Sequence, residues 1–219
     1  MGTEHFDTHA TTWDEDEDKR RRSEEIARAV AAVVPTAAGT RLLEYGAGTG
    51  LVTQALLDAA PGAAGQVTLA DNSSGMRAVL QDKLDDGRLP SEARVWDLDL
   101  VHDEVPAERF DLIVSSMVLH HVHALDPVLA GLAAMLEDGG HLCVADLDLE
   151  DGSFHADTHD FDGHDGFDRG ELARAMAAAG LEVVDVADAA SVEKHGRTYP
   201  VFLMTARRTA REPLRTGRT

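Results

Sequence analysis

Short runs of apolar residues alternate along this chain with longer stretches in which apolar residues recur at helical spacing. Runs without polar interruption are typical of strands that are buried on both faces, as in a parallel sheet. They predict seven strands, at Leu42–Leu43, Val67–Ala70, Ala93–Asp97, Phe110–Ser115, His141–Ala145, Glu182–Val186 and Val201–Ala206. Because helices of roughly 10–15 residues separate most of these strands, the pattern predicts an α/β fold with a doubly wound sheet.

Capping and turn residues mark the ends of the later helices. Asp126 is predicted to be an N-cap followed by Pro127 at the first helical position, and Gly139 and Gly140 are predicted to close that helix. Asp168 has capping-box spacing to the acid three residues further on, so it is predicted to begin the last helix.

The last two strands have no helix between them, because residues 187–200 lack a helical pattern of useful length. Parallel neighbours need a crossover connection, whereas antiparallel neighbours are joined directly. We therefore expect a hairpin, with the final strand antiparallel in an otherwise parallel sheet.

The 219 residues suffice for one domain with appended segments. Residues 1–38 are expected to form an N-terminal cap, residues 39–206 the domain, and residues 207–219 a basic C-terminal tail. Within the domain, residues 146–167 are rich in Asp, His and Gly and too long for an ordinary connection, which predicts an active-site loop. We expect this loop and Phe6–Trp13 to form a mobile lid.

The composition is that of a globular protein with a strongly acidic balance. Hydrophobic residues make up 43% and charged residues 27%, and 20 Lys and Arg against 40 Asp and Glu give a net charge of −20. This charge disfavours nucleic acid and anionic membranes as partners and favours small molecules. The single cysteine, Cys143, excludes an internal disulfide, and neither a membrane helix nor a secretion signal is apparent, so a cytoplasmic location is expected. The oligomeric state is left open.

A glycine-rich loop follows the first predicted strand. Glycines at positions 46, 48 and 50 allow a tight turn and let a ligand approach the backbone closely. The dinucleotide fingerprint would place its third glycine at position 51, where this chain has Leu51. Glu44 would repel a phosphate but can accept a hydrogen bond from an ammonium group, which favours an amino-acid-like ligand.

Asp71 ends the second predicted strand. A carboxylate at this place can bind both hydroxyls of a ribose, although an aspartate here can also be a simple helix cap. The glycine loop one strand earlier favours the ribose interpretation.

These residues together resemble the class I S-adenosylmethionine-dependent methyltransferases. The resemblance covers roughly residues 39–206 and rests on Glu44-x-Gly46-x-Gly48-x-Gly50, Asp71, Asp97 or Asp99, and Phe110-Asp111-Leu112-Ile113-Val114-Ser115 running into Leu119-His120-His121-Val122. The opening Phe6-Asp7-x-x-Ala10-x-x-Trp13-Asp14 is also similar to the N-terminal cap of the ubiquinone/menaquinone-type methyltransferases. The resemblance implies a Rossmann-like methyltransferase fold with strand order 3-2-1-4-5-7-6, an antiparallel strand 7 and an N-terminal cap helix.

The resemblance also implies which residues bind S-adenosylmethionine. They are Glu44, Gly46, Ala47, Gly48, Gly50, Asp71, Asn72, Met76, Asp97, Leu98, Ser115 and Trp13. Glu44 and the glycine loop would hold the methionine part, Asp71 the ribose, and Asp97 with the Leu98 backbone the adenine amino group. Asp99 fits the adenine role nearly as well, because the Asp-Leu pair repeats.

Two histidines after the fourth strand, His120 and His121, are the candidates for a catalytic base, with packing as the alternative. Methyl transfer requires attacker, methyl and sulfur to lie in line, and a base only where the nucleophile must lose a proton. The histidines and aspartates of residues 155–165 have no compact helical ligand spacing, so a solvated acidic loop is favoured over a metal site.

The sequence therefore predicts an S-adenosylmethionine-dependent methyltransferase that acts on a small-molecule acceptor. A nicotinamide-dependent oxidoreductase is disfavoured by Leu51 and by the lack of a Tyr-x-x-x-Lys pair. A noncatalytic S-adenosylmethionine-binding or regulatory protein stays open, since binding residues are not catalytic residues.

Overall fold

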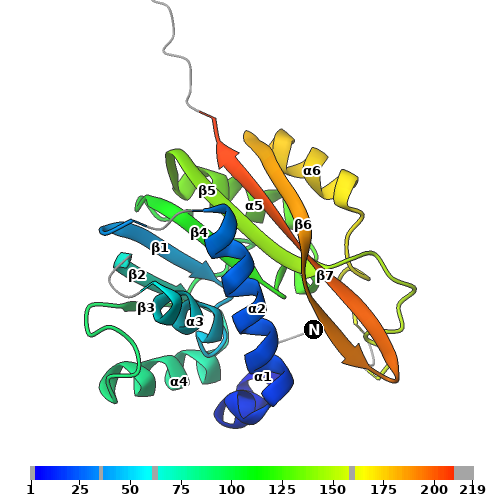
Figure 1. The fold of residues 1–219 in the computed structure, drawn as a ribbon, viewed down its shortest axis with the longest axis horizontal. Helices are drawn as coiled ribbons and strands as arrows, with labels where there is room; N and C mark the ends of the chain where they lie inside the picture. The colour runs from blue at the N-terminus through cyan, green and yellow to red at the C-terminus, as the bar shows by residue number, and fades with distance from the viewer. Residues whose placement is uncertain (1–2, 35–36, 61–63, 158–160, 210–219) are drawn as a thin grey trace, which may run out of the picture.

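The computed structural model describes residues 3–34, 37–60, 64–157 and 161–209 (Figure 1). Its centre is a seven-stranded sheet in the order β3-β2-β1-β4-β5-β7-β6, in which β7 is antiparallel to both neighbours and the other paired strands are parallel. The strands are β1 (Thr40–Tyr45), β2 (Ala64–Ala70), β3 (Arg94–Trp96), β4 (Phe110–Ser116), β5 (Leu136–Leu147), β6 (Leu181–Lys194) and β7 (Arg197–Arg208). The predicted fold class and strand order are confirmed.

Helices cover both faces of this sheet (Figure 1). They are α1 (Glu4–His9), the 3₁₀ helix η1 (Ala10–Glu15), α2 (Glu17–Val33), α3 (Leu51–Ala59), α4 (Ser74–Asp85), the 3₁₀ turn η2 (Leu119–His121), α5 (Leu125–Met135) and α6 (Arg169–Ala178). Leu112 and Val114 of β4 pack with α2 and α3 on one face, whereas Ile113 between them packs with α5 and α6 on the other. Successive side chains of the strand therefore pack into opposite helical layers. Because both faces are buried, the strand has an uninterrupted apolar run.

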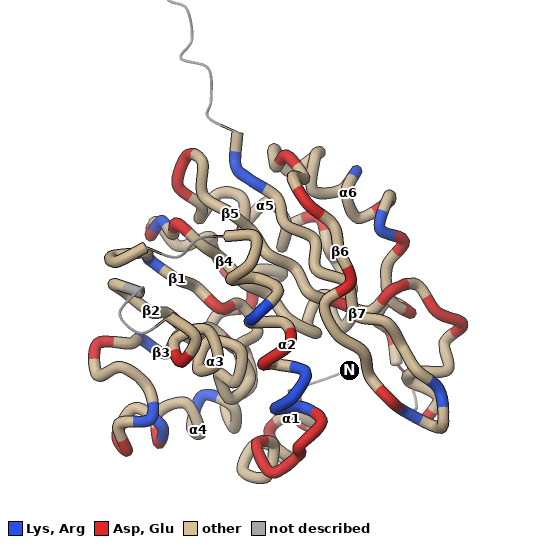
Figure 2. The backbone as a smooth tube through the Cα atoms, viewed as in Figure 1, with Lys and Arg blue, Asp and Glu red and all other residues tan. Residues whose placement is uncertain are grey.

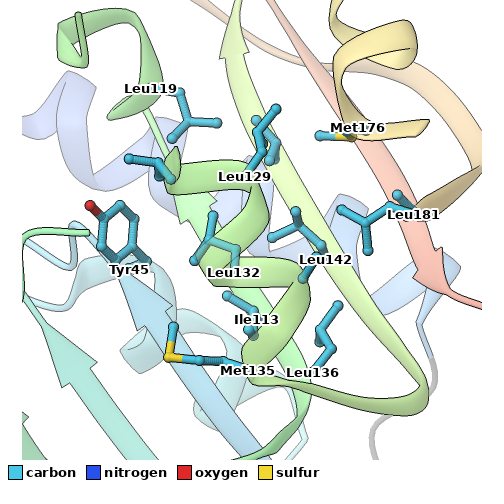
Figure 3. Close-up of a cluster of buried hydrophobic side chains, with 14 of the residues drawn as sticks. Tyr45, Ile113, Leu119, Leu129, Leu132, Met135, Leu136, Leu142, Met176 and Leu181 are labelled. Atoms are coloured by element: carbon cyan, nitrogen blue, oxygen red, sulfur yellow. The ribbon is translucent and has the colours of Figure 1, made fainter. Parts of the chain in front are cut away.

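The α5 side holds the larger core. Figure 3 shows Leu129 and Leu132 of α5 beside Ile113 and Leu142 of the central strands. All four side chains are fully buried. Burying an aliphatic side chain contributes about 1.5–3 kcal/mol, so this layer holds the central strands together and fixes where their carboxyl ends lie.

The helix α5 differs from its predicted bounds. It ends at Met135, and the two glycines expected to close it lie in β5, where Leu136 already pairs with Phe110. Gly139 has a φ of 82°, so it bends the strand at a register irregularity rather than capping a helix. Asp126 lies in the first turn and not at the N-cap, a position where an acid still interacts favourably with the helix dipole.

The predicted hairpin is confirmed but is longer than expected. The strands β6 and β7 extend through residues 187–200 and meet at His195 and Gly196, whose φ values of 53° and 71° are both positive. Positive φ at both central residues is typical of the two-residue turn that matches the twist of a hairpin. Because β7 runs to Arg208, the first two residues of the predicted basic tail belong to the sheet. Residues 210–219 lie outside the described part of the chain.

Charges gather on the N-terminal segment, where Figure 2 shows acidic residues at the start of α2 and basic residues in its next turn. Asp16 caps this helix by accepting from the backbone N–H groups of Asp18 and Lys19. Among the described residues, no helix combines the length and the apolar character needed to cross a membrane.

The N-terminal segment is fastened over the carboxyl edge of the sheet. Asp7 of α1 accepts hydrogen bonds from the Ser73 hydroxyl at 2.6 Å and from the Gly75 backbone at 2.7 Å, at the start of α4. These bonds, the Ser73 hydroxyl first, lower the pKa of Asp7. The side chain therefore joins the predicted lid to the body of the domain.

A second contact fastens the 3₁₀ helix η1. Asp14 accepts from the Thr49 hydroxyl at 2.5 Å and pairs with Lys83 at 2.6 Å. Lys83 is buried and also donates to the Thr49 carbonyl, so one cation joins η1, the glycine loop and α4. Any opening of the predicted lid has to break these polar contacts.

We expect Asp7→Ala to loosen the N-terminal segment. Loss of the acceptor leaves the start of α4 without its partner, so amide hydrogen exchange of residues 4–15 should become several-fold faster while the central strands stay protected. Exchange measured by mass spectrometry checks this, with Glu4→Ala, an exposed acid of the same helix, as control. Unchanged exchange in Asp7→Ala would show that other contacts hold this segment.

Candidate active site

The carboxyl ends of three adjacent parallel strands, β2, β1 and β4, meet at one edge of the sheet. The loop after β1 crosses to β2, because the backbone N–H groups of Gly46 and Ala47 both donate to the Ala70 carbonyl at 2.8 and 2.9 Å. This crossing places the glycine loop beside Asp71, the residue that follows β2.

Two glycines of this loop are required for different reasons. Gly46 has a φ of 69°, and a Cβ there would lie 2.3 Å from the Val118 side chain. Gly48 has a φ of 54°, and a Cβ there would meet nothing within 4 Å. The first glycine therefore allows close packing on the segment after β4, and the second leaves the backbone open to a ligand.

Glu44, near the end of β1, is almost completely buried, with 2% of its surface exposed. Its Oε2 accepts from the Thr53 backbone N–H at 3.0 Å, in the first turn of α3. Burial raises the pKa of Glu44 to about 7. A carboxylate held in this way favours a cationic partner that restores its charge.

Asp71 is also buried and is held by the backbone. Its Oδ2 accepts from the Gly48 N–H at 2.7 Å and its Oδ1 from the Ser73 N–H at 2.8 Å. Burial raises the pKa of Asp71 above its usual range. Each oxygen has a single backbone partner here, so the carboxylate keeps acceptor capacity for further hydroxyl donors.

A cleft of about 1110 Å³, its open mouth included, lies against these groups. Of the predicted cofactor residues, the cleft is lined by Trp13, Glu44, Gly46, Ala47, Gly48, Asp71, Asn72, Met76 and Leu98. His121 lines it as well. The structure thus brings most of the predicted site together around one cavity.

Three predicted cofactor residues lie outside the lining. Gly50 is the N-cap of α3, with a left-handed φ of 80°. Asp97 is exposed and pairs with Arg77 at 2.9 Å, whereas Asp99 lines the cleft and accepts from the Asn72 amide at 3.4 Å. Ser115 is buried within the sheet, and the cleft is instead lined by the two residues that follow it.

One of those two residues, Met117, carries a strained backbone that sequence analysis missed. Its φ of 58° is rare for a long side chain, and its N–H donates to the Ala145 carbonyl at 2.8 Å. Strain of this kind is often found at functional sites. No feature of the sequence indicates it, because Met has no preference for this conformation.

The two candidate bases differ sharply in environment. His120 is 1% exposed, and its Nδ1 lies 2.6 Å from Oδ1 of the buried Asp146. His121 lines the cleft, and burial lowers its pKa to about 2. At neutral pH, His121 is therefore an uncharged imidazole with little tendency to take a proton.

The loop after β5 is packed against these histidines. His155 is 7% exposed, its ring stacks on Phe161 at 3.7 Å between centroids, and its centroid lies 5.3 Å from that of His120. The prediction of a solvated acidic loop is therefore wrong for His155, although residues 158–160 lie outside the described part. The two ends of the loop are joined to each other, because the Leu149 backbone N–H donates to the Phe167 carbonyl at 3.0 Å.

Asp111, part of the Phe110–Ser115 motif, lies at the opposite end of β4 from the cleft. It accepts from the Arg41 backbone and from two guanidinium nitrogens at 2.9–3.1 Å. The paired guanidinium is the first cause that lowers the pKa of Asp111. This bidentate pair joins β1 to β4, and no part of it faces the cleft lining.

Comparison with known proteins identifies the kind of domain. A family model described as a methyltransferase domain matches residues 18–186. A malonyl-[acyl-carrier protein] O-methyltransferase of Geobacter sulfurreducens is 32% identical over 179 residues, which are 77% of this chain and 65% of that protein. An uncharacterized methyltransferase of Schizosaccharomyces pombe is 32% identical over 127 residues, 55% of this chain and 43% of that protein. The chain thus spans less than two thirds of either relative.

A solved structure shares the fold. It is an S-adenosylmethionine-dependent methyltransferase from Mesorhizobium loti, with a TM-score of 0.65, 20% identity, and coverage of 83% of this chain and 96% of that one. The family match favours the predicted methyltransferase over the nicotinamide-dependent alternative.

We expect Glu44→Gln to change how stability depends on pH. The pKa of Glu44 is raised in the folded state, so its contribution to stability is present at low pH and is lost as the pH rises through about 7. The difference in the free energy of unfolding, Glu44→Gln minus wild type, should therefore rise by about 2–3 kcal/mol between pH 5 and pH 8. Urea unfolding at both pH values checks this, with the exposed Glu24→Gln as control. A constant difference between wild type and Glu44→Gln would contradict the raised pKa.

Proposed function

The chain belongs to the class I S-adenosylmethionine-dependent methyltransferases, and we propose that it transfers a methyl group from S-adenosylmethionine to a small-molecule acceptor. One observation carries the proposal. Two buried carboxylates, Glu44 and Asp71, end adjacent strands on either side of a glycine loop whose Gly48 is open to the cleft. The acceptor class and the cytoplasmic location stay predictions.

The residues present fit this cofactor part by part. Glu44 can take the ammonium group of the methionine part, which would restore its ionised form at neutral pH. The open backbone at Gly48 leaves room for the chain of the ligand. Asp71 has one backbone N–H on each oxygen and acceptor capacity left for the two ribose hydroxyls.

For the adenine amino group, the geometry favours Asp99 over Asp97. Leu98 and Asp99 line the cleft, whereas Asp97 is exposed and paired with Arg77. Asp99 also accepts from Asn72, another residue of the lining. We therefore assign adenine recognition to Leu98 and Asp99.

When bound, S-adenosylmethionine supplies a methyl group activated by the sulfonium charge. The protein has to hold the acceptor in line with that methyl and keep water out. Aromatic and aliphatic side chains of the cleft lining, among them Phe6, Trp13 and Val118, suit this task. Phe6 packs edge-on against His121, which follows β4. Closure of the N-terminal segment, which carries Phe6 and Trp13, over the cleft is the gating step that we propose for the lid.

Neither candidate histidine is well suited to act as a base. His121 lines the cleft, but its pKa of about 2 makes it a poor proton acceptor. His120 has an aspartate partner but lies behind the lining. We propose that both are positioning residues.

We expect S-adenosylhomocysteine to bind with at least micromolar affinity and Asp71→Asn to weaken binding about 10- to 150-fold, because hydrogen bonds to a charged group contribute roughly 1.5–3 kcal/mol. Titration calorimetry checks this. The matched control is Asp97→Asn, an exposed aspartate outside the cleft, which should bind normally.

If the wild type does not bind S-adenosylhomocysteine at millimolar concentration, the proposed function is wrong. Weakened binding in Asp97→Asn together with normal binding in Asp99→Asn would return adenine recognition to Asp97. A noncatalytic binding protein would bind S-adenosylhomocysteine normally and give no methylated product in single-turnover reactions with phenols, amines, carboxylic acids and acyl thioesters.

We also expect cofactor affinity to depend on pH through Glu44. Below its pKa of about 7 the carboxyl is protonated, so binding an ammonium group has to release that proton. Affinity should fall by up to ~10-fold per pH unit below 7 and level off above it. Calorimetry in buffers of different ionisation enthalpy counts the released proton, and the dependence should vanish in Glu44→Gln. A pH-independent wild type would mean that the ammonium group binds elsewhere.

A further inference from the structure

We propose that His120, His121 and His155 form a binding site for one divalent transition-metal ion of the zinc class, beside the reacting end of the cleft. One ring nitrogen from each of the three lies within 4.8 Å of one ring nitrogen of each of the others. Three imidazoles that converge in this way are a known ligand set for zinc, with the fourth position open.

The fold brings the three rings together from two segments. His120 and His121 follow β4 in η2, and His155 lies in the loop after β5. Because β4 and β5 are parallel neighbours, the two segments leave the same edge of the sheet. The His164 backbone N–H donates to the His120 carbonyl at 2.7 Å, which holds the loop against η2.

Two of the rings carry a nitrogen that packing alone leaves unsatisfied. Nδ1 of His121 and Nδ1 of His155 are buried and have no hydrogen-bond partner within the described residues. His155 as a whole is more than nine-tenths buried. A buried polar atom without a partner destabilises the fold, and a bound metal ion would remove that cost.

The third ring is oriented by a carboxylate. Nδ1 of His120 lies 2.6 Å from Asp146, which leaves Nε2 as the nitrogen that His120 can offer. Asp146 is buried and is itself held by the Leu147 and His120 backbone N–H groups at 2.8 and 3.3 Å. Metal-binding histidines usually have such a carboxylate behind them, which fixes the tautomer and the ring orientation.

The place of the cluster suggests a use, which rests on the proposed function. His121 belongs both to the triad and to the lining of the cleft, beside Met117 and Val118. An ion there with an open position would bind an oxygen or nitrogen of the acceptor, lower its pKa so that its proton passes to solvent, and orient it toward the methyl group.

Titration of the metal-free full chain with Co²⁺ and Zn²⁺ tests the site. We expect one equivalent to bind at micromolar concentration or below, with the visible absorption of nitrogen-coordinated Co²⁺. His155→Gln removes a ligand outside the cleft lining and should weaken binding at least ~100-fold, while Asp146→Asn should weaken it about 10- to 100-fold. The control His102→Gln changes an exposed histidine and should bind as the wild type does.

Absence of binding by the wild type would overturn the proposal, and so would equal binding by wild type and His155→Gln, because the ion would then lie elsewhere on this acidic chain. Far-ultraviolet circular dichroism and S-adenosylhomocysteine titration on the same samples establish that each variant is folded. A wild type that binds S-adenosylhomocysteine but neither metal overturns the metal site alone. One that binds the metals but not S-adenosylhomocysteine contradicts the proposed function alone.

Discussion

The parallel pairing of β1 with β2 is the constraint on which the site depends. Their register sets Glu44 opposite Leu69 and Tyr45 opposite Ala70, so Glu44 and Asp71 come to one edge of the sheet. The glycine loop then donates to both the Ala70 carbonyl and the Asp71 carboxylate. Burial raises the pKa of both carboxyl groups. Backbone N–H groups hold both carboxylates in place for donors from a ligand.

Most of the fold was predictable because its signals are local and agree with one another. Uninterrupted apolar runs and the missing crossover helix predicted the doubly wound sheet and the antiparallel β7, and Asp168 predicted the start of the last helix. The strand order was implied by the family resemblance, and the structure confirms all of these features. The errors occur where one residue type has two uses. A glycine such as Gly139 is typical of a helix end. Here α5 already ends at Met135, because Leu136 pairs with Phe110 in the sheet, and Gly139 instead lies at a bend within β5.

The residues that we propose for the cofactor lie in motifs that the sequence shows directly, whereas the cluster of three histidines does not. Glu44, Asp71 and the glycines lie in short motifs whose spacing carries the chemistry. His155 is 34 residues after His121 in the chain, and only the adjacency of β4 and β5 brings them together. The sequence does hold a usable signal, because segments that follow two parallel neighbouring strands leave the same edge of the sheet. This signal can be used only once the strand order is known. Packing, which no motif encodes, then leaves the buried Nδ1 atoms of His121 and His155 without a hydrogen-bond partner among the described residues.

The most direct test of this account is a crystal structure of the chain with S-adenosylhomocysteine. We predict that the ribose hydroxyls lie within hydrogen-bond distance of the Asp71 carboxylate, the amino group beside Glu44, and the sulfur at the end of the cleft lined by Met117 and His121. A ligand bound elsewhere, or one whose ribose and amino group contact neither carboxylate, would contradict the claim that these two buried acids define the site.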